Sequence, residues 1–168
     1  MQTNTWSLAA VNGLILAMVT IVITLVQTVL EPGTVIKIFL WAAKLGLSIW
    51  LLYYFIRDYA KEQEHFTYGQ GFNYGFKICL LSSIVCAIYI FLHFTLFFPD
   101  SVAASLEQAA AILESSNPQA LETLDKIGGK LPQITTIVTL AYNTLFGTLA
   151  TAIIANFTKK GDIFSTPS

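Results

Sequence analysis

The chain has 168 residues, of which 55% are hydrophobic and 11% are charged, and its formal net charge is -1 at pH 7. Soluble domains carry a charge on about a quarter of their residues, so this composition excludes an ordinary water-soluble domain and predicts a protein folded in a lipid bilayer. Without clustered lysines and arginines, the sequence also predicts no nucleic-acid partner.

The first predicted membrane span covers residues 6–30, which contain no charged side chain. This run exceeds the roughly 20 residues that a helix needs to cross the hydrocarbon core. Small and polar residues recur along it at helical spacing, namely Gly13, Ala17, Thr20, Thr24 and Gln27. We expect this stripe to face other helices, because threonine and glutamine commonly form hydrogen bonds between membrane helices.

A second span is predicted over residues 34–56, after a break at Glu31-Pro32-Gly33. Proline disfavours a helical residue before it and glycine permits a reversal. The connection is short, so the first two helices should form an antiparallel hairpin.

Two lysines lie within the second span, and Lys44 is the deeper one. It is about 15 Å from the start of the span by helical rise, a depth at which a charge needs a partner, a wet cavity or a function. Lys37, Trp41, Lys44 and Ser48 share one helical face, which we expect to face the bundle interior. Two interpretations stay open: a lysine paired with polar groups of neighbouring helices, or an anion or proton site.

Residues 57–71 are predicted to form a cytoplasmic loop whose first part extends the second helix into water. The carboxylates of Asp58, Glu62 and Glu64 alternate here with basic residues, a pattern typical of a solvated face. No nucleophile with a base and no ligand cluster for a metal or cofactor is recognisable. The chain is therefore not expected to be an enzyme.

The third span is predicted over residues 72–98. Gly71 and Gly75 lie at its start, where small residues let two helix backbones approach closely. Cys79 and Cys86 are too far apart along one helix for a disulfide. His93, near the far end, is interpreted as a hydrogen-bonded interfacial histidine, with a proton-relay role as the alternative.

Residues 100–130 are alanine-rich and acidic, and we predict an extracytoplasmic amphipathic helical hairpin between the third and fourth spans. Asn117-Pro118 has the residue types that begin a helix, and Gly128-Gly129 has those that end one. The apolar stripes of the two helices are Val102, Leu106, Ala109 and Leu113, then Leu121, Leu124 and Ile127. This insert is either a lid over the bundle or headgroups, or a surface that docks a partner.

The fourth span is predicted over residues 133–157. Asn143, Gly147 and Thr151 lie on one face at four-residue steps, which indicates contact with neighbouring helices. The tail, residues 158–168, is expected to be disordered. Lysine and arginine are more frequent on the side of the two termini and the loop 57–71, so the positive-inside rule predicts both termini in the cytoplasm.

The start of the third span reads Phe66-Thr67-Tyr68-Gly69-Gln70-Gly71-Phe72 and continues to Gly75; Pro99 and an acidic insert follow the span, and the last span is rich in small residues. In these features the chain resembles domain-of-unknown-function family 4199, a family of short four-span inner-membrane proteins found mainly in Bacteroidota. The resemblance covers nearly the whole chain. It implies a multi-pass protein of the bacterial inner membrane and implies no functional residues.

The predicted fold is all-α, an integral membrane four-helix bundle. The candidate intramembrane polar site comprises Lys44, Gln27, Ser48, Asn143 and His93, and the candidate helix-packing residues are Gly71, Gly75 and Gly147. The leading hypothesis is an accessory or scaffold subunit that binds a membrane-protein partner or a second copy of itself. The alternative is a small oligomeric transporter or ion conduit that uses Lys44. Membrane lipids are the other expected partners.

Overall fold

The computed structural model describes residues 5–116, 124 and 126–160, and it divides into two units that we describe separately. Unit 1 contains residues 1–85 and 142–168, and unit 2 contains residues 86–141. The predictions for Asn117-Pro118, for Leu121 and for the tail from residue 161 lie outside the described residues.

The regular elements of the described chain are helical, which confirms the all-α prediction. They are α1 (Thr5–Leu30), α2 (Thr34–Lys61), α3 (Tyr68–Leu92), the π-helical turn η1 (His93–Phe97), α4 (Asp100–Ser116) and α6 (Leu131–Thr158). Four of these segments are long and apolar enough to cross a membrane: α1, α2, α3 with η1, and α6. Each coincides with one of the four predicted spans to within five residues.

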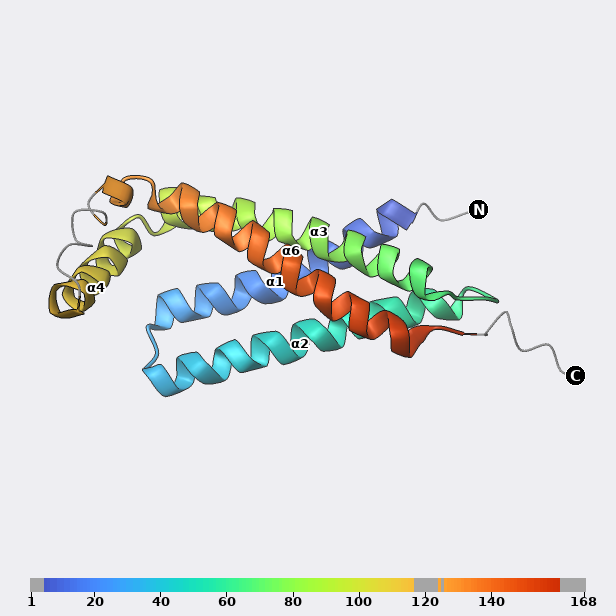
Figure 1. Cartoon of the computed structure of the whole chain (residues 1–168). Coiled ribbons are helices and arrows are strands. Elements are labelled where there is room, and N and C mark those ends of the chain that lie inside the picture. The colour runs from blue at the N-terminus through green and yellow to red at the C-terminus, as the bar shows by residue number, and fades with distance from the viewer. Residues whose placement is uncertain (1–4, 117–123, 125, 161–168) are drawn as a thin grey trace, which may run out of the picture. The chain divides into compact units, whose positions relative to one another are not determined.

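Helices α1 and α2 form a hairpin around Glu31-Pro32-Gly33 (Figure 1). Glu31 ends α1 with a φ of 41°, in the left-handed region that side chains other than glycine rarely adopt. The backbone amide of Lys37 donates to Gly33 O (3.1 Å), the first hydrogen bond of the next helix. The predicted break therefore reverses the chain within three residues.

The core of unit 1 lies at the end of the α1–α2 hairpin opposite this turn. The start of α1, the α2–α3 loop and the end of α6 come together there (Figure 1). The buried residues of these helices are Ala9, Gly13, Leu16 and Ala17 of α1, Leu52, Phe55, Ile56 and Ala60 of α2, and Thr151, Ile154, Ala155 and Thr158 of α6. By contrast, none of residues 18–51, all of them described, is buried.

A reciprocal cap starts α3 four residues before the predicted span. The backbone amide of Thr67 donates to Gln70 Oε1 (2.8 Å), and the amide of Gln70 donates to Thr67 Oγ1 (3.3 Å). This arrangement is a capping box, which satisfies amides that the first helical turn leaves without acceptors. The Thr-x-x-Gln spacing in the sequence therefore marks the start of α3, which the glycines and aromatic residues of the same motif did not indicate.

The tail does not become irregular at residue 158 as expected. Helix α6 continues to Thr158, and Lys160 then pairs with Phe66 in an antiparallel bridge. The Phe66 amide donates to Lys160 O (3.3 Å), and the Lys160 amide donates to Phe66 O (2.8 Å). Because the Phe66 ring is fully buried, this pairing joins the end of the described chain to the core of unit 1.

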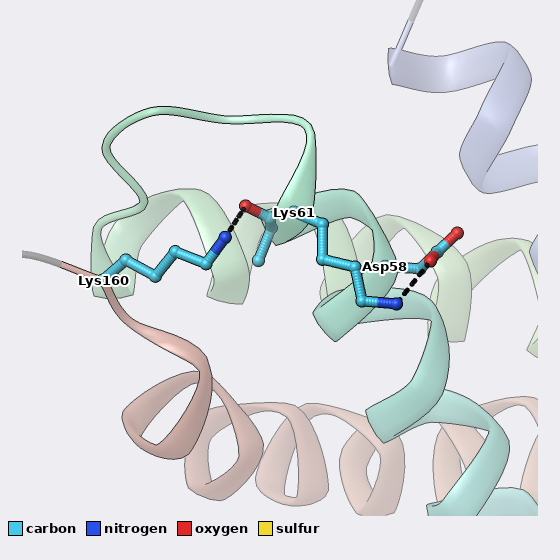
Figure 2. Close-up of polar contacts among 4 residues, drawn as sticks. Asp58, Lys61 and Lys160 are labelled. Carbon is cyan, nitrogen blue, oxygen red and sulfur yellow. Dashed lines mark hydrogen bonds and ion pairs between the residues drawn. The ribbon is translucent and has the colours of Figure 1, made fainter.

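The Lys160 side chain forms a second link, from its ammonium to the backbone oxygen of Ala60 near the end of α2 (2.9 Å; Figure 2). Lysines near a helix C-terminus commonly donate to the last carbonyls of a helix, and Ala60 O also accepts from the Gln63 amide (3.3 Å). We expect Lys160→Met to increase hydrogen exchange at the Phe66 amide about five-fold, because a net hydrogen bond contributes about 1 kcal/mol. Hydrogen exchange read by mass spectrometry tests this, with Lys159→Met as the matched control; equal exchange in the two variants would contradict the link.

In unit 2, η1 widens the helix just before Pro99, since the amide of Phe98 donates to His93 O (2.8 Å), five residues earlier. Helix α4 follows, and its Leu106 lies against Gly128, where an added Cβ would be 3.3 Å from Leu106 Cδ1. Val102, Leu106 and Ala109 of the predicted stripe are partly buried. These contacts agree with an amphipathic α4; the membrane side on which the insert lies stays a prediction.

Candidate functional site

The glycines named as packing residues lie at close helix contacts of unit 1. A Cβ at Gly75 would lie 2.5 Å from Thr151 Cγ2 of α6 and 2.6 Å from Ile56 Cδ1 of α2. A Cβ at Gly147 would be 2.7 Å from Cys79 Sγ, and one at Gly71 would be 3.1 Å from the Phe66 ring. The approaches at Gly75 and Gly147 are too short for a larger residue unless neighbouring atoms shift, so α6 packs closely on α3 through these two glycines; the contact at Gly71 is tight but longer.

Gly13 of the polar stripe in the first span provides the corresponding contact between α1 and α3. A Cβ there would lie 2.9 Å from the backbone oxygen of Ile78. The expectation that this part of the stripe faces another helix therefore agrees with the structure. Farther along α1, Thr24 and Thr28 direct their hydroxyls to the backbone of their own helix, to Thr20 O (2.8 Å) and Thr24 O (3.0 Å).

The lysine face of α2 is more open than expected. Lys44 and Ser48 are half-buried, whereas Lys37 is exposed and the Trp41 side chain is 52% exposed. Within the described part of the chain, no acidic side chain pairs with Lys44; the ion pair found there joins Lys61 to Asp58. Helical spacing identified which residues share a face, but it could not show that unit 1 leaves half of that face uncovered.

An open cavity of about 540 Å³, with both polar and apolar walls, lies beside the turn of the α1–α2 hairpin. It is lined by Thr24, Gln27, Thr28, Thr34, Lys37, Ile38 and Trp41. Gln27 lies on its wall and donates from Nε2 to Lys37 O (3.4 Å). The structure therefore brings Gln27 together with Lys37 rather than with Lys44, which is not part of this lining.

Asn143 is half-buried on α6 in unit 1. Two turns farther along, Thr151 Oγ1 lies 3.6 Å from Cys79 Sγ of α3. Cys79 and Cys86 are both buried, and neither forms a disulfide. Thr151 is therefore a polar residue of α6 that contacts α3, and it lies in the core of unit 1.

His93 belongs to unit 2, where it is 2% exposed. Tyr89 OH lies 3.0 Å from His93 Nδ1, and the ring centroids of Phe94 and Phe98 are 5.2 Å and 4.8 Å from that of the imidazole. The contact with Tyr89 agrees with the hydrogen-bonded histidine that the sequence favoured, and the proton-relay alternative stays a prediction. Its location in a π-helical turn is notable, because such turns recur at functional sites.

One polar contact between helices of unit 1 was not predicted from the sequence. Asn12 of α1 donates from Nδ2 to Tyr74 OH of α3 (2.8 Å), and the Tyr74 ring stacks on Tyr59 of α2 with centroids 4.1 Å apart. The available signal was an asparagine in the stretch 8–19, which is apolar apart from this residue, because an asparagine within a membrane needs a partner. This cluster joins three helices around the most deeply buried tyrosine.

Chemically, these arrangements provide hydrogen bonds and the positive charges of Lys37 and Lys44. Among residues 5–116, 124 and 126–160, no three His, Cys, Asp or Glu side chains come together as metal ligands would. What the geometry favours is contact between helices and binding of a polar or anionic group.

Four membrane-length helices, packed in unit 1 through glycines and an Asn–Tyr hydrogen bond, define the class: a multi-pass helical membrane protein. The chain belongs to the family described as "Protein of unknown function (DUF4199)", whose model matches residues 9–160. This match confirms the resemblance found in the sequence and covers the four long helices apart from the first residues of α1. No curated protein and no solved structure matches the chain.

Proposed function

We propose that the protein is an accessory or scaffold subunit that binds a membrane-protein partner or a second copy of itself through the α1–α2 hairpin. The observation that carries this proposal is the absence of any buried residue among the described residues 18–51, together with a half-buried lysine in the middle of α2. Apolar side chains on this hairpin can contact lipid without cost. Lys44 and Ser48 cannot, because polar groups at membrane depth are costly unless other groups contact them.

A helix of another chain that packed along this face would cover both side chains. Hydrogen bonds between membrane helices contribute about 0.6 kcal/mol each on average, so several such contacts can select one partner. The small side chain of Ser48 also permits close approach, since it adds little bulk to this face of α2.

An oligomeric transporter or ion conduit is the second candidate. The observation in its favour is the open cavity of about 540 Å³ beside Lys37, because Lys37 and Lys44 lie two turns apart on one face of α2. Four helices are few for alternating access, which in many transporters uses paired repeats, so this candidate also requires a second copy.

We further propose that the core end of unit 1 faces the cytoplasm of a bacterial cell, at its inner membrane. Four basic residues support this orientation by the positive-inside rule, namely Arg57, Lys61, Lys159 and Lys160.

Site-specific photocrosslinking in membranes tests the leading proposal. A photoreactive amino acid at Trp41 would report on the hairpin face, and one at Tyr142 of α6 is the matched control, since both side chains are aromatic and 52% exposed. We expect a product of defined mass from position 41 alone, identified as a dimer or a stoichiometric partner. Lys44→Met, which keeps the length of the side chain and removes its charge, should lower the yield several-fold.

Two results would count against the accessory role. A monomer without any crosslinked product in native-like lipid would contradict the proposal that the hairpin binds a partner or a second copy. A defined oligomer that conducts ions or solute, and loses that flux in Lys44→Met, would favour the conduit instead.

A further inference from the structure

A basic pocket lies between the end of α2 and the end of α6, at the core end of unit 1. Its volume is about 270 Å³, and it is lined by Tyr53, Arg57, Ala60, Lys61, Phe157, Thr158, Lys159 and Lys160. Four of these eight residues are basic and none is acidic. Such a concentration stands out in a chain with only 9 lysines and arginines in total.

Two of the four cations already form a hydrogen bond or an ion pair, as Figure 2 shows. Lys160 Nζ donates to Ala60 O (2.9 Å), and Lys61 Nζ lies 3.2 Å from Asp58 Oδ1. The carboxylate of Asp58 offsets the charge of Lys61, while the backbone oxygen of Ala60 leaves the charge of Lys160 in place. No acidic residue of the lining offsets Arg57 or Lys159, so the pocket keeps an excess of positive charge.

The lining is also graded from apolar to basic along the helices. Tyr53 lies one helical turn deeper in α2 than Arg57, whose guanidinium carbon is 6.0 Å from the centroid of the Tyr53 ring. On α6, the ring of Phe157 is 78% exposed and precedes the basic pair. Aromatic side chains below and cations above match the order of acyl chain, glycerol and phosphate in a lipid leaflet.

We propose that this pocket binds the phosphate of an anionic phospholipid. Basic pockets between membrane helices at a membrane surface recognise such headgroups. Arg57 and Lys159 contact the phosphate, Tyr53 and Phe157 contact the glycerol and the first acyl carbons, and Lys160 holds the two helix ends at the required separation. A soluble phosphate compound shares the phosphate chemistry, but it would make no use of the exposed Phe157 ring.

Native mass spectrometry of the full chain in detergent tests this assignment, with phosphatidylglycerol or phosphatidylcholine added. We expect the wild-type chain to bind phosphatidylglycerol preferentially, and this preference to decrease with added salt, as screening of a charge pair requires. Each basic residue near an anionic lipid contributes a factor of about five to binding. Arg57→Gln/Lys159→Gln should therefore weaken phosphatidylglycerol binding about 25-fold.

Two comparison variants separate the site from general charge effects. Lys126→Gln/Lys130→Gln removes the same number of charges from unit 2 and should leave binding unchanged. Arg57→Lys/Lys159→Arg keeps the charges and should retain most of the affinity; if Arg57→Gln/Lys159→Gln fails to fold, the salt dependence of the wild-type chain and this charge-keeping variant still decide.

Three outcomes would overturn the proposal. They are equal binding of the two lipids, phosphatidylglycerol binding that does not change with salt, and unchanged binding in Arg57→Gln/Lys159→Gln. Displacement of the lipid by millimolar glycerol phosphate would instead assign the pocket to a soluble phosphate compound.

Discussion

Tyr74→Ala is expected to be the most damaging single substitution in unit 1, with a loss of about 3 to 5 kcal/mol in the free energy of unfolding, as for large aromatic residues removed from other cores. Tyr74 is 1% exposed, the largest of the fully buried side chains. The change would remove its stacking on Tyr59 and leave the Asn12 amide without its acceptor. Unfolding in mixed micelles, followed by circular dichroism, measures this loss.

Tyr74→Phe is the matched variant, because it keeps the ring and removes only the hydroxyl. Its cost should be much smaller, about 0.6 kcal/mol and at most about 1.7 kcal/mol, as measured for hydrogen bonds between membrane helices. A double-mutant cycle with Asn12→Leu should recover that coupling. Equal losses for Tyr74→Ala and Tyr74→Phe would show that the ring contributes little and that the cluster depends on the hydrogen bond.

The four long helices could be predicted because the bilayer sets their length and composition. A long uncharged run such as residues 6–30 is typical of a helix that crosses a membrane. Pro32 interrupts the helix between the first two spans, and this effect does not depend on the rest of the fold. Glycine contacts could be anticipated as well, since Gly71, Gly75 and Gly147 occur where helices must meet. These are local properties of the chain.

Which helices pack on each face of a given helix depends on the tertiary structure, and the predictions of these contacts were incomplete. The periodicity of α2 placed Lys37 and Lys44 on one face, but which helices pack against it depends on the whole bundle. The structure leaves Lys37 exposed beside a cavity and Lys44 half-buried. Residues far apart in sequence come together for the same reason, as with Asn12 and Tyr74.

The basic pocket shows how a sequence feature can be noticed and its role missed. In the sequence, Arg57 and Lys159 belong to the basic residues on the side of the two termini and the loop 57–71, whose excess predicts only the orientation in the membrane. The structure places both on one pocket because the end of α6 returns to the end of α2, where Lys160 donates to Ala60 O. Orientation and lipid binding are compatible roles, since both depend on anionic headgroups.

Gly75→Ala is expected to lower the free energy of unfolding by about 1 to 3 kcal/mol through overpacking. The new Cβ would lie 2.5 Å from Thr151 Cγ2, which α6 holds in place, and 2.6 Å from Ile56 Cδ1, the movable end of its side chain. Relief must therefore come from a shift of α6 relative to α3. Gly46→Ala is the control, because a Cβ there meets nothing within 4 Å; it should be neutral or slightly stabilising, as alanine favours a helix more than glycine does.

The clash can be tested by making Thr151, the residue that the new Cβ contacts, smaller. Thr151→Ser removes Cγ2, the atom closest to the new Cβ, and retains the hydroxyl that lies 3.6 Å from Cys79 Sγ. Combined with Gly75→Ala, it should restore most of the lost stability, with a coupling free energy of at least about 0.5 kcal/mol, as found for residues in direct contact. Additive effects of the two substitutions would mean that Thr151 does not limit the size of the side chain at position 75. The close approach of α3 and α6 would then not depend on this glycine.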